Sequence, residues 1–389
     1  MSLVFRLLFS VLFTGSLHYY LWRRTTDVLE LGRRSRRVLG AGIFLLYLSI
    51  PLTTSARMWA PDLAKVLAWI AFPWLAFVGL ATVALGVAEL PRLVAWLLSR
   101  KRDAQASAAG LSRRQFLGRV TGGAAIAVAG AAVARGVAEA RGEHEIVTVE
   151  VPLAKLPRAL DGFSIVQLTD LHTGMTIDRD FVQRVVDRAN ALAPDLIALT
   201  GDLVDGPVAS LREDIAPLAQ LRAPHGVFAV TGNHEYYAGV DEWIEEITRL
   251  GARYLRNERV VIGDAAASFD LAGVDDYSAH EYLGHGEDLP KATAGRDERR
   301  ALVLLAHQPR QVKTAAEHGV DLQLSGHTHG GQIWPWHYIV RIQQGGLLAG
   351  SYRHRDTQLY VSRGCGYWGP PVRVLAPLEI TRIILRCAA

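Results

Sequence analysis

The chain has 389 residues, half of them hydrophobic, and a formal net charge of +4. Residues 1–140 carry 17 Lys and Arg against 6 Asp and Glu, whereas residues 141–389 carry 25 against 32, so the basic excess belongs to the N-terminal third. An acidic C-terminal part argues against a nucleic-acid-binding protein, whose basic residues would line the globular surface. The two cysteines, Cys365 and Cys387, are too few for a disulfide framework or a thiolate metal site; two free thiols are expected, although one bridge is allowed.

Residues 1–140 are expected to form a membrane region. Four apolar runs alternate with basic loops, and this pattern disfavours the buried helices of a soluble domain. The third run extends to about residue 98 and is broken by Pro73, Glu89 and Pro91. The extension of the third run could lie in the membrane interface. The predicted spans cover about residues 3–22, 38–55, 63–88 and 120–138.

The basic loops predict the orientation of these spans. The loops at 23–37 and 99–119 are rich in arginine, whereas the short connection at 56–62 is nearly uncharged. Since positive loops stay on the cytoplasmic side, the first two should be cytoplasmic and the third should face outward. We therefore expect a multi-pass protein of the cell membrane with residues 141–389 on its extracytoplasmic side.

Residues 112–117, Ser-Arg-Arg-Gln-Phe-Leu, resemble a twin-arginine export signal, and a Gly/Ala-rich apolar segment follows at 122–134. The motif follows three apparent spans, whereas such signals usually stand at the N-terminus, and an arginine pair before a membrane helix is also ordinary positive-inside chemistry. The twin-arginine export machinery is therefore an expected partner only if this motif is an export signal. Residues 138–140, Ala-Glu-Ala, fit a peptidase site, but we favour retention in the membrane.

Residues 141–389 have the pattern of an α/β domain, with strand-like runs separated by helix-like ones. Helices are expected near residues 179–192, 211–221, 240–250 and 309–318. Strands are expected at residues 146–151, 163–168, 196–199, 227–230, 268–272, 302–305, 321–324, 359–361 and 379–385.

The stretch Ser325–Gln332, Ser-Gly-His-Thr-His-Gly-Gly-Gln, is the most informative in the chain. It follows an apolar strand, and residues two apart in an extended segment point the same way. The imidazoles of His327 and His329 can therefore face one point, and imidazole is the commonest metal ligand in proteins. An isolated His-x-His could equally be a polar turn, so the interpretation depends on further ligands elsewhere.

Four other apolar strands end in residue types that bind metal ions. Taken singly, Asp170 or Asp202 could cap a helix and His307 could be a hydrogen-bonded core histidine. The same arrangement occurs five times, however, and ligands of α/β sheets bind beyond the carboxyl ends of the strands. The four ends read Thr169-Asp170-Leu171-His172, Thr200-Gly201-Asp202-Leu203-Val204-Asp205, Thr231-Gly232-Asn233-His234-Glu235 and Ala306-His307.

In this order the five motifs resemble the calcineurin-like metallophosphoesterase superfamily. The Ser-Gly-His-Thr-His-Gly-Gly-Gln form, with Gly364-x-Gly366 and Pro371-x-Arg373 downstream, is most similar to its bacterial membrane-linked phosphodiesterase branch. The resemblance covers about residues 145–389. It implies an α/β fold, a four-layer α-β-β-α sandwich, for residues 141–389, which would be the catalytic domain after the N-terminal transmembrane helices.

The resemblance also implies a dinuclear metal centre. A set of Asp, Asn and His without Cys suits Mn, Fe or Zn and does not choose among them. Two dications about 3.5–4 Å apart need a shared anionic bridge, which a carboxylate supplies. Carried over position by position, one ion is held by Asp170, His172, Asp202 and His329, and the other by Asp202, Asn233, His307 and His327.

His234 has no ligand role left in this set. The resemblance makes it the catalytic residue that stabilises the transition-state charge or protonates the leaving oxygen, while a metal-bound hydroxide attacks phosphorus in line. Asp205 and Glu235 could orient the ligands from behind, or be surface acids. The expected activity is that of a phosphodiesterase on the extracytoplasmic side.

Other functions share this pattern. A phosphomonoesterase or a nucleotide-lipid pyrophosphatase would use the same site, and a membrane tether makes a lipid or cell-envelope phosphate ester a plausible substrate. The polar loop 276–288, with His280 and His285, could shape substrate choice but is better interpreted as a solvated insertion. A sensor or transporter with a metal-binding domain fits poorly, because the ligand set is complete and the spans hold almost no charge.

Overall fold

The computed structural model describes residues 3–99 and 113–388. The chain divides into two compact units, one of residues 1–138 with 369–372 and one of residues 139–368 with 373–389. The first contains the long N-terminal helices and the second contains the five motifs. Both cysteines are free thiols, as expected.

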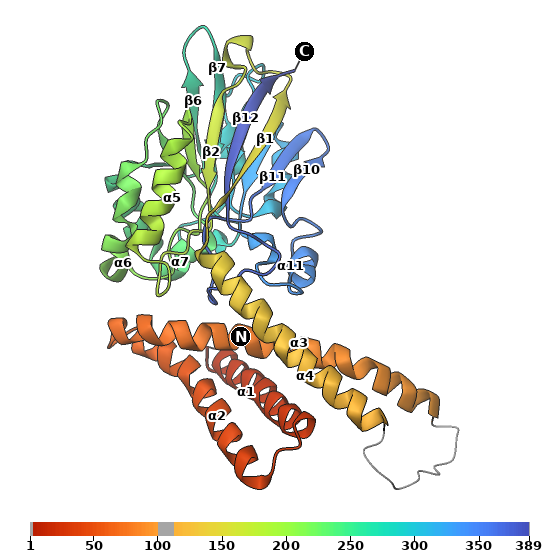
Figure 1. The fold of residues 1–389 in the computed structure, drawn as a ribbon. Coiled ribbons are helices and arrows are strands. Elements are labelled where there is room, and N and C mark those ends of the chain that lie inside the picture. The colour runs from red at the N-terminus through yellow and green to blue at the C-terminus, as the bar shows by residue number, and fades with distance from the viewer. Residues whose placement is uncertain (1–2, 100–112, 389) are drawn as a thin grey trace. The chain divides into compact units, whose positions relative to one another are not determined.

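The N-terminal unit consists of long helices (Figure 1). Among the described residues, three segments are long and apolar enough to cross a membrane: Arg33–Ala56, Pro61–Leu90 and Gly118–Arg141. The span predicted at 3–22 lies in a helix but is not among these three, so it stays a prediction. Of the twin-arginine-like motif at 112–117, only residue 112 lies outside the described residues, and residues 113–117 form the first turn of a helix. The helices are α1 (Leu3–Val28), α2 (Arg33–Ala56), α3 (Pro61–Ser99) and α4 (Arg113–Arg141).

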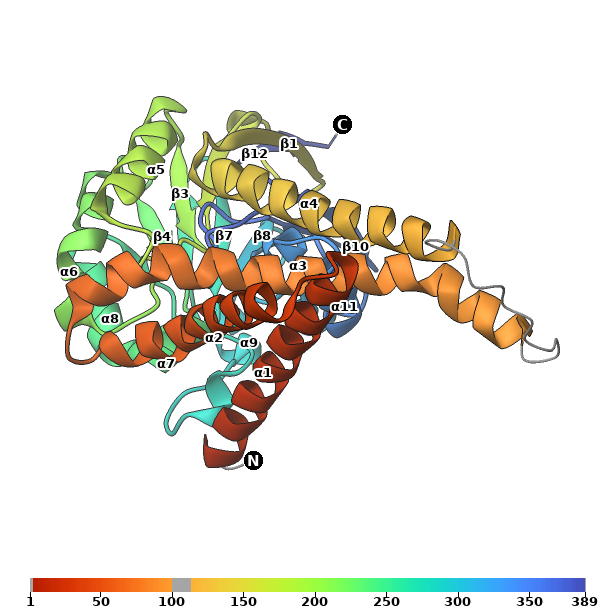
Figure 2. The same cartoon turned by 60° about the horizontal axis from the view of Figure 1, so that its bottom comes forward.

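Helix α3 is a single continuous helix (Figure 2), although Pro73 and Pro91 interrupt the third apolar run of the sequence. Membrane helices tolerate proline when other groups satisfy the backbone. Two hydrogen bonds join polar side chains of different helices in this unit. The indole Nε1 of Trp74 on α3 donates to Nε2 of His18 on α1 at 2.9 Å. The hydroxyl of Tyr20 donates to Glu89 at 3.0 Å.

The C-terminal unit contains two six-stranded sheets (Figure 1). The central strands β2, β3 and β4 are parallel to one another, as are β7, β8 and β9, so the carboxyl ends of each set meet at one edge. In order across the first sheet the strands are β1 (Glu145–Leu153), β12 (Glu379–Cys387), β2 (Ser164–Leu168), β3 (Leu196–Leu199), β4 (Val227–Ala229) and β5 (Arg253–Tyr254). In the second they are β10 (Gly350–His354), β11 (Thr357–Val361), β9 (Leu322–Ser325), β8 (Leu302–Leu305), β7 (Ser268–Gly273) and β6 (Glu258–Gly263).

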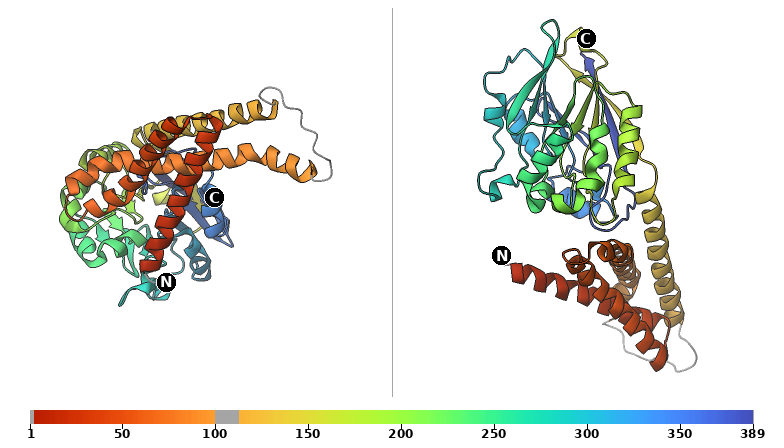
Figure 3. Two further views of the ribbon diagram at one scale, coloured as in Figure 1. Left: turned by 90° about the horizontal axis from the view of Figure 1, so that it is seen from below. Right: turned by 90° about the vertical axis from the view of Figure 1, so that its left-hand side faces the viewer.

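Helices cover the outer face of each sheet (Figure 3). One apolar core fills the space between the sheets. This is the four-layer α-β-β-α arrangement that the family resemblance implied. Helices α5, α6 and α8 pack against the first sheet, and α9 and α10 against the second. The helices are α5 (Arg179–Ala191), α6 (Val208–Ile215), α7 (Asn233–Ala238), α8 (Val240–Arg249), α9 (Leu289–Thr293), α10 (Val312–Glu317) and α11 (His337–Gln343).

Residue patterns explain these layers. Every residue of β2 and of β3 is buried, because helices cover one face and the second sheet covers the other. Helix α5 instead buries one stripe, including Phe181, Val185 and Ala189, at helical spacing. Its N-cap, Asp178, accepts a hydrogen bond from the backbone N–H of Phe181 and so fixes where the helix begins.

All nine predicted strands are present, with ends shifted by at most two residues. The sequence missed β5, β6 and β10, and the helices α7, α9 and α11. These elements are short or lie at sheet edges, and β6 and β10 contain mostly half-buried or exposed residues. Without continuous burial they lack the apolar pattern on which the predictions depended.

Candidate metal centre

Five loops meet at one edge of the sandwich, and each follows a strand end. The loops after β2, β3, β4, β8 and β9 carry the seven predicted ligands. The backbone is left-handed at five of the seven, an uncommon conformation for residues other than glycine. These five, with their φ angles, are Asp170 (54°), His172 (53°), Asp202 (53°), His327 (71°) and His329 (52°).

Two glycines allow these loops to approach one another. A Cβ on Gly232 would lie 2.2 Å from Oδ1 of Asp202, and a Cβ on Gly326 would lie 2.1 Å from Oδ2 of Asp170. Both distances are far inside van der Waals contact, so any side chain there would push the carboxylates away. The glycines of these motifs are therefore needed for close packing of the ligand loops.

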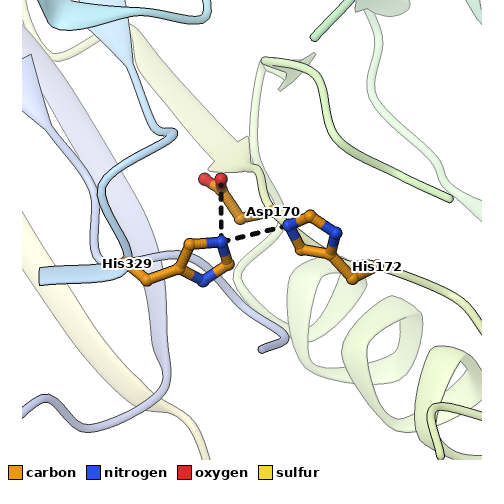
Figure 4. Close-up of side chains that lie close together, drawn as sticks. All are labelled: Asp170, His172 and His329. Carbon is orange, nitrogen blue, oxygen red and sulfur yellow. Dashed lines mark hydrogen bonds and ion pairs between the residues drawn. The ribbon is translucent and has the colours of Figure 1, made fainter. Parts of the chain in front are cut away.

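The first cluster contains Asp170, His172 and His329 (Figure 4). Nε2 of His172 lies 3.0 Å from Nε2 of His329, and the latter atom lies 3.4 Å from Oδ1 of Asp170. The three side chains are nearly or fully buried. Two ring nitrogens and a carboxylate oxygen thus converge on one point, as the ligands of a cation do.

The second cluster contains Asp202, His307 and His327. Oδ2 of Asp202 lies 3.1 Å from Nε2 of His307, which in turn lies 3.2 Å from Nδ1 of His327. The same Oδ2 lies 3.7 Å from Nε2 of His172 in the first cluster. One carboxylate oxygen of Asp202 is therefore placed between the two clusters.

Comparison with known proteins agrees with this geometry. The family profile of the calcineurin-like phosphoesterases matches residues 163–331, which include all seven predicted ligands. The chain is 37% identical over 301 residues, 75% of its length, to a zebrafish (Danio rerio) transmembrane protein with a metallophosphoesterase domain, of which it covers 67%. It is 33% identical over 285 residues, 71% of its length, to a metallophosphoesterase of Bacillus subtilis, of which it covers 98%.

The chain belongs to the calcineurin-like metallophosphoesterase family. It is thereby classed with the phosphoric ester hydrolases. A Helicobacter pylori metallophosphoesterase is also similar, with 40% identity over 253 residues, 64% of this chain. The chain spans about two thirds of the length of the Helicobacter and zebrafish relatives.

Hydrogen bonds set the orientation of two histidine rings of this metallophosphoesterase. Nδ1 of His172 lies 2.7 Å from the Asp205 carboxylate, and Nδ1 of His307 lies 2.8 Å from the carbonyl oxygen of Thr200. Since those acceptors carry no proton, each ring donates from Nδ1 and, when neutral, directs the Nε2 lone pair into its cluster. Such backing of a ligand ring is usual at metal sites.

The chemistry of the donor set fits divalent cations. Asn233 also belongs to this edge: it is 7% exposed, and its Oδ1 has no hydrogen-bond partner among the described residues. A buried amide oxygen without a partner costs free energy, which a cation would offset. The site offers carboxylate and amide oxygens and imidazole nitrogens without sulfur, which suits Mn, Fe or Zn.

The charges of the metal-free site are strongly coupled. Burial disfavours the imidazolium of His172, but the carboxylates of Asp205 and Asp202 outweigh it and raise the pKa to about 9. Burial and the positive His307 nearby lower the pKa of His327 to about 3. Protons therefore compensate the buried carboxylates when no cation is bound, and cations would displace them.

His234 lies beside both clusters. Its backbone N–H donates to Oδ1 of Asp202 at 2.8 Å, and its Nδ1 lies 2.7 Å from the Asp205 carboxylate. The exposed rings of Tyr237 and Trp368 flank it edge-on, with ring centroids 5.1 and 5.8 Å away. The sequence analysis missed both aromatic residues, although one stands three positions after His234 and the other follows Gly364-x-Gly366.

Asp205 and Glu235, left open by the sequence, have different surroundings. The same Oδ1 of Asp205 lies 2.7 Å from Nδ1 of His172 and from Nδ1 of His234, so this acid orients both rings. Glu235 is 1% exposed and accepts hydrogen bonds from the backbone N–H groups of Gly232, Asp202 and Leu203. It fixes the backbone that carries Asp202, and neither acid is a surface residue.

Arg373 is a further residue whose place the sequence did not predict. Its side chain is 1% exposed and donates to backbone carbonyls, including those of Gly366, Arg363 and Ala376, at 2.5–2.9 Å. Its Nη2 also lies 3.3 Å from Nδ1 of His329. Burial lowers its pKa to about 10. Arg373 thus ties the C-terminal loop to the ligand loop that contains His329.

The histidines of the loop 276–288 lie outside the ligand clusters. Nδ1 of His285 contacts Arg256 at 2.8 Å, and Nδ1 of His280 contacts the carbonyl oxygen of Tyr277. The loop is solvated only in part, because Asp276 is fully buried and accepts hydrogen bonds from Gln308. The interpretation of the loop as a solvated insertion is therefore wrong for Asp276, its first residue.

Proposed function

We propose that this protein is a phosphodiesterase that uses two divalent cations. Asp170, His172 and His329 would hold one cation, Asn233, His307 and His327 the other, and Asp202 would bridge them. The observation that carries this proposal is the position of Asp202, whose Oδ2 lies 3.7 Å from the first cluster and 3.1 Å from the second. When bound, such cations supply a water nucleophile at neutral pH and neutralise charge on the phosphoryl oxygens.

His234 is proposed to assist departure of the leaving group. Nδ1 of His234 lies 2.7 Å from the Asp205 carboxylate and donates to it, so Nε2 of the ring is left to face the leaving-group oxygen. The hydrogen bond from the His234 backbone to Asp202 fixes the distance between this ring and the bridging carboxylate. The ring is thus positioned beside the cations without being needed to bind them.

The substrate is proposed to be a diester of lipid or cell-envelope origin. Two observations support it: the chain contains apolar helices long enough to cross a membrane, and Tyr237 and Trp368 offer aromatic surface beside His234. A second ester substituent or a large leaving group would pack against those rings. A phosphomonoesterase or a nucleotide-lipid pyrophosphatase would use the same ligands.

A turnover panel on the purified full-length chain tests the proposal. It compares diesters, monoesters, lipid phosphates and nucleotide-lipid pyrophosphates, each with Mn, Fe or Zn. We expect the highest kcat/KM with a diester. A preference for monoesters or pyrophosphates would replace the proposed substrate class, and metal binding without turnover of any substrate would favour a sensor.

The catalytic unit is proposed to lie outside the cytoplasm, because the loops at 23–37 and 99–119 are basic. A reporter fused after residue 140 should be active only as an extracytoplasmic marker. A cytoplasmic signal would show that the proposed topology is inverted.

In the same fusion, replacing Arg113 and Arg114 by Lys should block export if the pair is a twin-arginine signal. Normal export of this variant would show that the two arginines act only through their positive charge.

A further inference from the structure

The catalytic unit exposes an apolar surface beside the metal centre. It is formed by α11, the turn before it and the C-terminal loop, and it is called the α11 surface below. No residue of α11 is buried, and three of its large hydrophobic side chains are exposed to solvent. The side chains, with exposed fractions, are Trp334 (43%), Tyr338 (59%), Ile339 (53%), Ile342 (80%), Trp368 (57%) and Leu375 (83%).

The two segments of this surface are tied together. The side-chain amide of Gln332 exchanges two hydrogen bonds of 2.9 Å with the backbone of Trp368. The backbone N–H of Trp334 donates to the carbonyl oxygen of Val374. Leu375 has a left-handed backbone (φ 59°) while its side chain faces solvent, which is a costly arrangement for a bulky residue. The surface is therefore held in place rather than loosely attached.

The α11 surface is continuous with the ligand loop. Helix α11 begins eight positions after His329, and a Cβ on Gly331 would lie 2.3 Å from Cα of His337. Trp368 belongs both to this surface and to the pair of rings that flank His234. Whatever covers the α11 surface will therefore lie at the entrance to the metal centre.

The charge of these segments differs from that of the rest of the unit. Residues 141–389 are net acidic, yet between residues 322 and 378 the only acidic residue is Asp356. The same stretch contains Arg341 on α11 itself, next to Ile342. Tryptophan and tyrosine favour the interface between lipid and water, and arginine favours anionic headgroups.

The chain enters the catalytic unit at the edge that carries the metal centre. Strand β1 is parallel to β12 and β12 is antiparallel to β2, so β1 begins where β2 ends and Asp170 follows. The imidazole Nε2 of His144 lies 2.7 Å from the carbonyl oxygen of Cys365, which fixes this entry point. The membrane-length segment 118–141 ends three residues before β1, and three residues reach roughly 10 Å.

From these observations we propose that the α11 surface binds the interface of an anionic lipid bilayer. The aromatic and aliphatic side chains enter the headgroup region, and Arg341 pairs with anionic lipid. The metal centre then opens toward the membrane surface. This inference goes beyond the proposed activity and does not depend on it, because it concerns where the domain rests and not which bond it cleaves.

Accessibility of a spin label tests the proposal on the full-length chain in nanodiscs that contain anionic lipid. The label is placed at Ile342→Cys in a Cys387→Ser background, in which the remaining Cys365 is 1% exposed. The matched control is Val261→Cys on the edge strand β6, at a residue that is 47% exposed. At position 342 we expect collisions with oxygen dissolved in lipid and protection from a water-soluble nickel chelate, with the opposite at position 261.

Two results would overturn the proposal. Equal access of the chelate to both labels means that the α11 surface faces water. Protection of position 342 from oxygen as well as from the chelate means that protein covers it, either the membrane helices of the same chain or a second copy.

A second measurement connects the surface to catalysis. Ile342→Asp should lower turnover of a phosphate ester embedded in the bilayer by about tenfold, as expected when 1.4 kcal/mol of interfacial binding is lost. Turnover of water-soluble nitrophenyl phosphate esters should stay unchanged, and Val261→Asp should alter neither rate. An equal loss on both substrates would show a folding defect. If the unmodified protein cleaves no ester, the proposed function fails while the label data still decide the docking.

Discussion

The two ligand clusters differ in charge and in how their histidines are held. The first has two carboxylates within reach, Asp170 and the shared Asp202, whereas the second has Asp202 and the neutral amide of Asn233. In the first, His172 is backed by the carboxylate of Asp205; in the second, His307 is backed by a neutral carbonyl. Greater negative charge strengthens cation binding, so we expect the first cluster to retain its cation and the second to exchange it.

Removal of Asp202 should erase this difference, because it is the carboxylate between the clusters. Asp202→Ala should lose both cations and all measurable activity, and added metal should not restore either. Elemental analysis alongside rate measurements tests this, with the exposed Asp356→Ala as control. A variant that retains two cations would show that Asp202 does not bridge.

His234→Ala should not change how tightly either cluster holds its cation, because the ligands of both clusters are other residues. We expect both cations to stay bound while kcat falls by about 10²–10⁴-fold, the usual effect of losing a positioned proton donor. The loss should be smaller for esters of nitrophenol, which leaves without a proton.

Metal content and rates on good and poor leaving groups separate the alternatives. Loss of a cation in His234→Ala would make the histidine a ligand. Equal impairment on both leaving groups would indicate charge stabilisation in place of proton donation.

Asp205→Asn should weaken the first cluster selectively. Replacing the acid behind a ligand histidine lowers metal affinity by about 10–100-fold. The first cation should then exchange at a rate closer to that of the second. During dialysis against a chelator, the difference between the rates at which the two cations are lost should become smaller. An unchanged difference between the two rates of metal loss would contradict the proposal that the first cluster holds its cation more tightly.

The last of these predictions concerns the proton that a cation displaces from His172. Since the pKa of His172 in the metal-free protein is raised from 6.5 to about 9, its protonated form contributes stability that is complete below pH 6.5 and is lost as the pH rises through 9. A cation at the first cluster must displace this proton, so its affinity should rise by about tenfold per pH unit between pH 7 and 9. Calorimetry in buffers of different ionisation enthalpy counts the released protons, and a count of zero would contradict the raised pKa.

The fold and the grouping of the candidate ligands were predictable because the strands before them are continuously buried. Every residue of β2, β3, β8 and β9 is buried, and parallel strands bring their carboxyl ends together. The arrangement behind the ligands was not predictable. That Asp205 faces two histidines while Glu235 binds three backbone N–H groups depends on loop geometry that no residue spacing encodes.

The α11 surface escaped the sequence analysis for a different reason. Its helix is seven residues long and has no buried face, so it shows no core-facing stripe of the kind that identifies α5. Trp334 and Ile342 read in the sequence as ordinary hydrophobic residues of a domain, and only their exposure in the folded chain distinguishes them.

The left-handed backbone at five ligands implies a trade-off between stability and activity. Each such residue costs about 1 kcal/mol or more relative to a relaxed conformation, and glycine avoids that cost. His327→Gly should therefore leave the metal-free protein more resistant to urea than His327→Ala does, although both lose the same imidazole. Glycine at these positions would make the fold more stable but would remove the metal ligands. The backbone strain at this edge of the sandwich is therefore the cost of placing ligand side chains there.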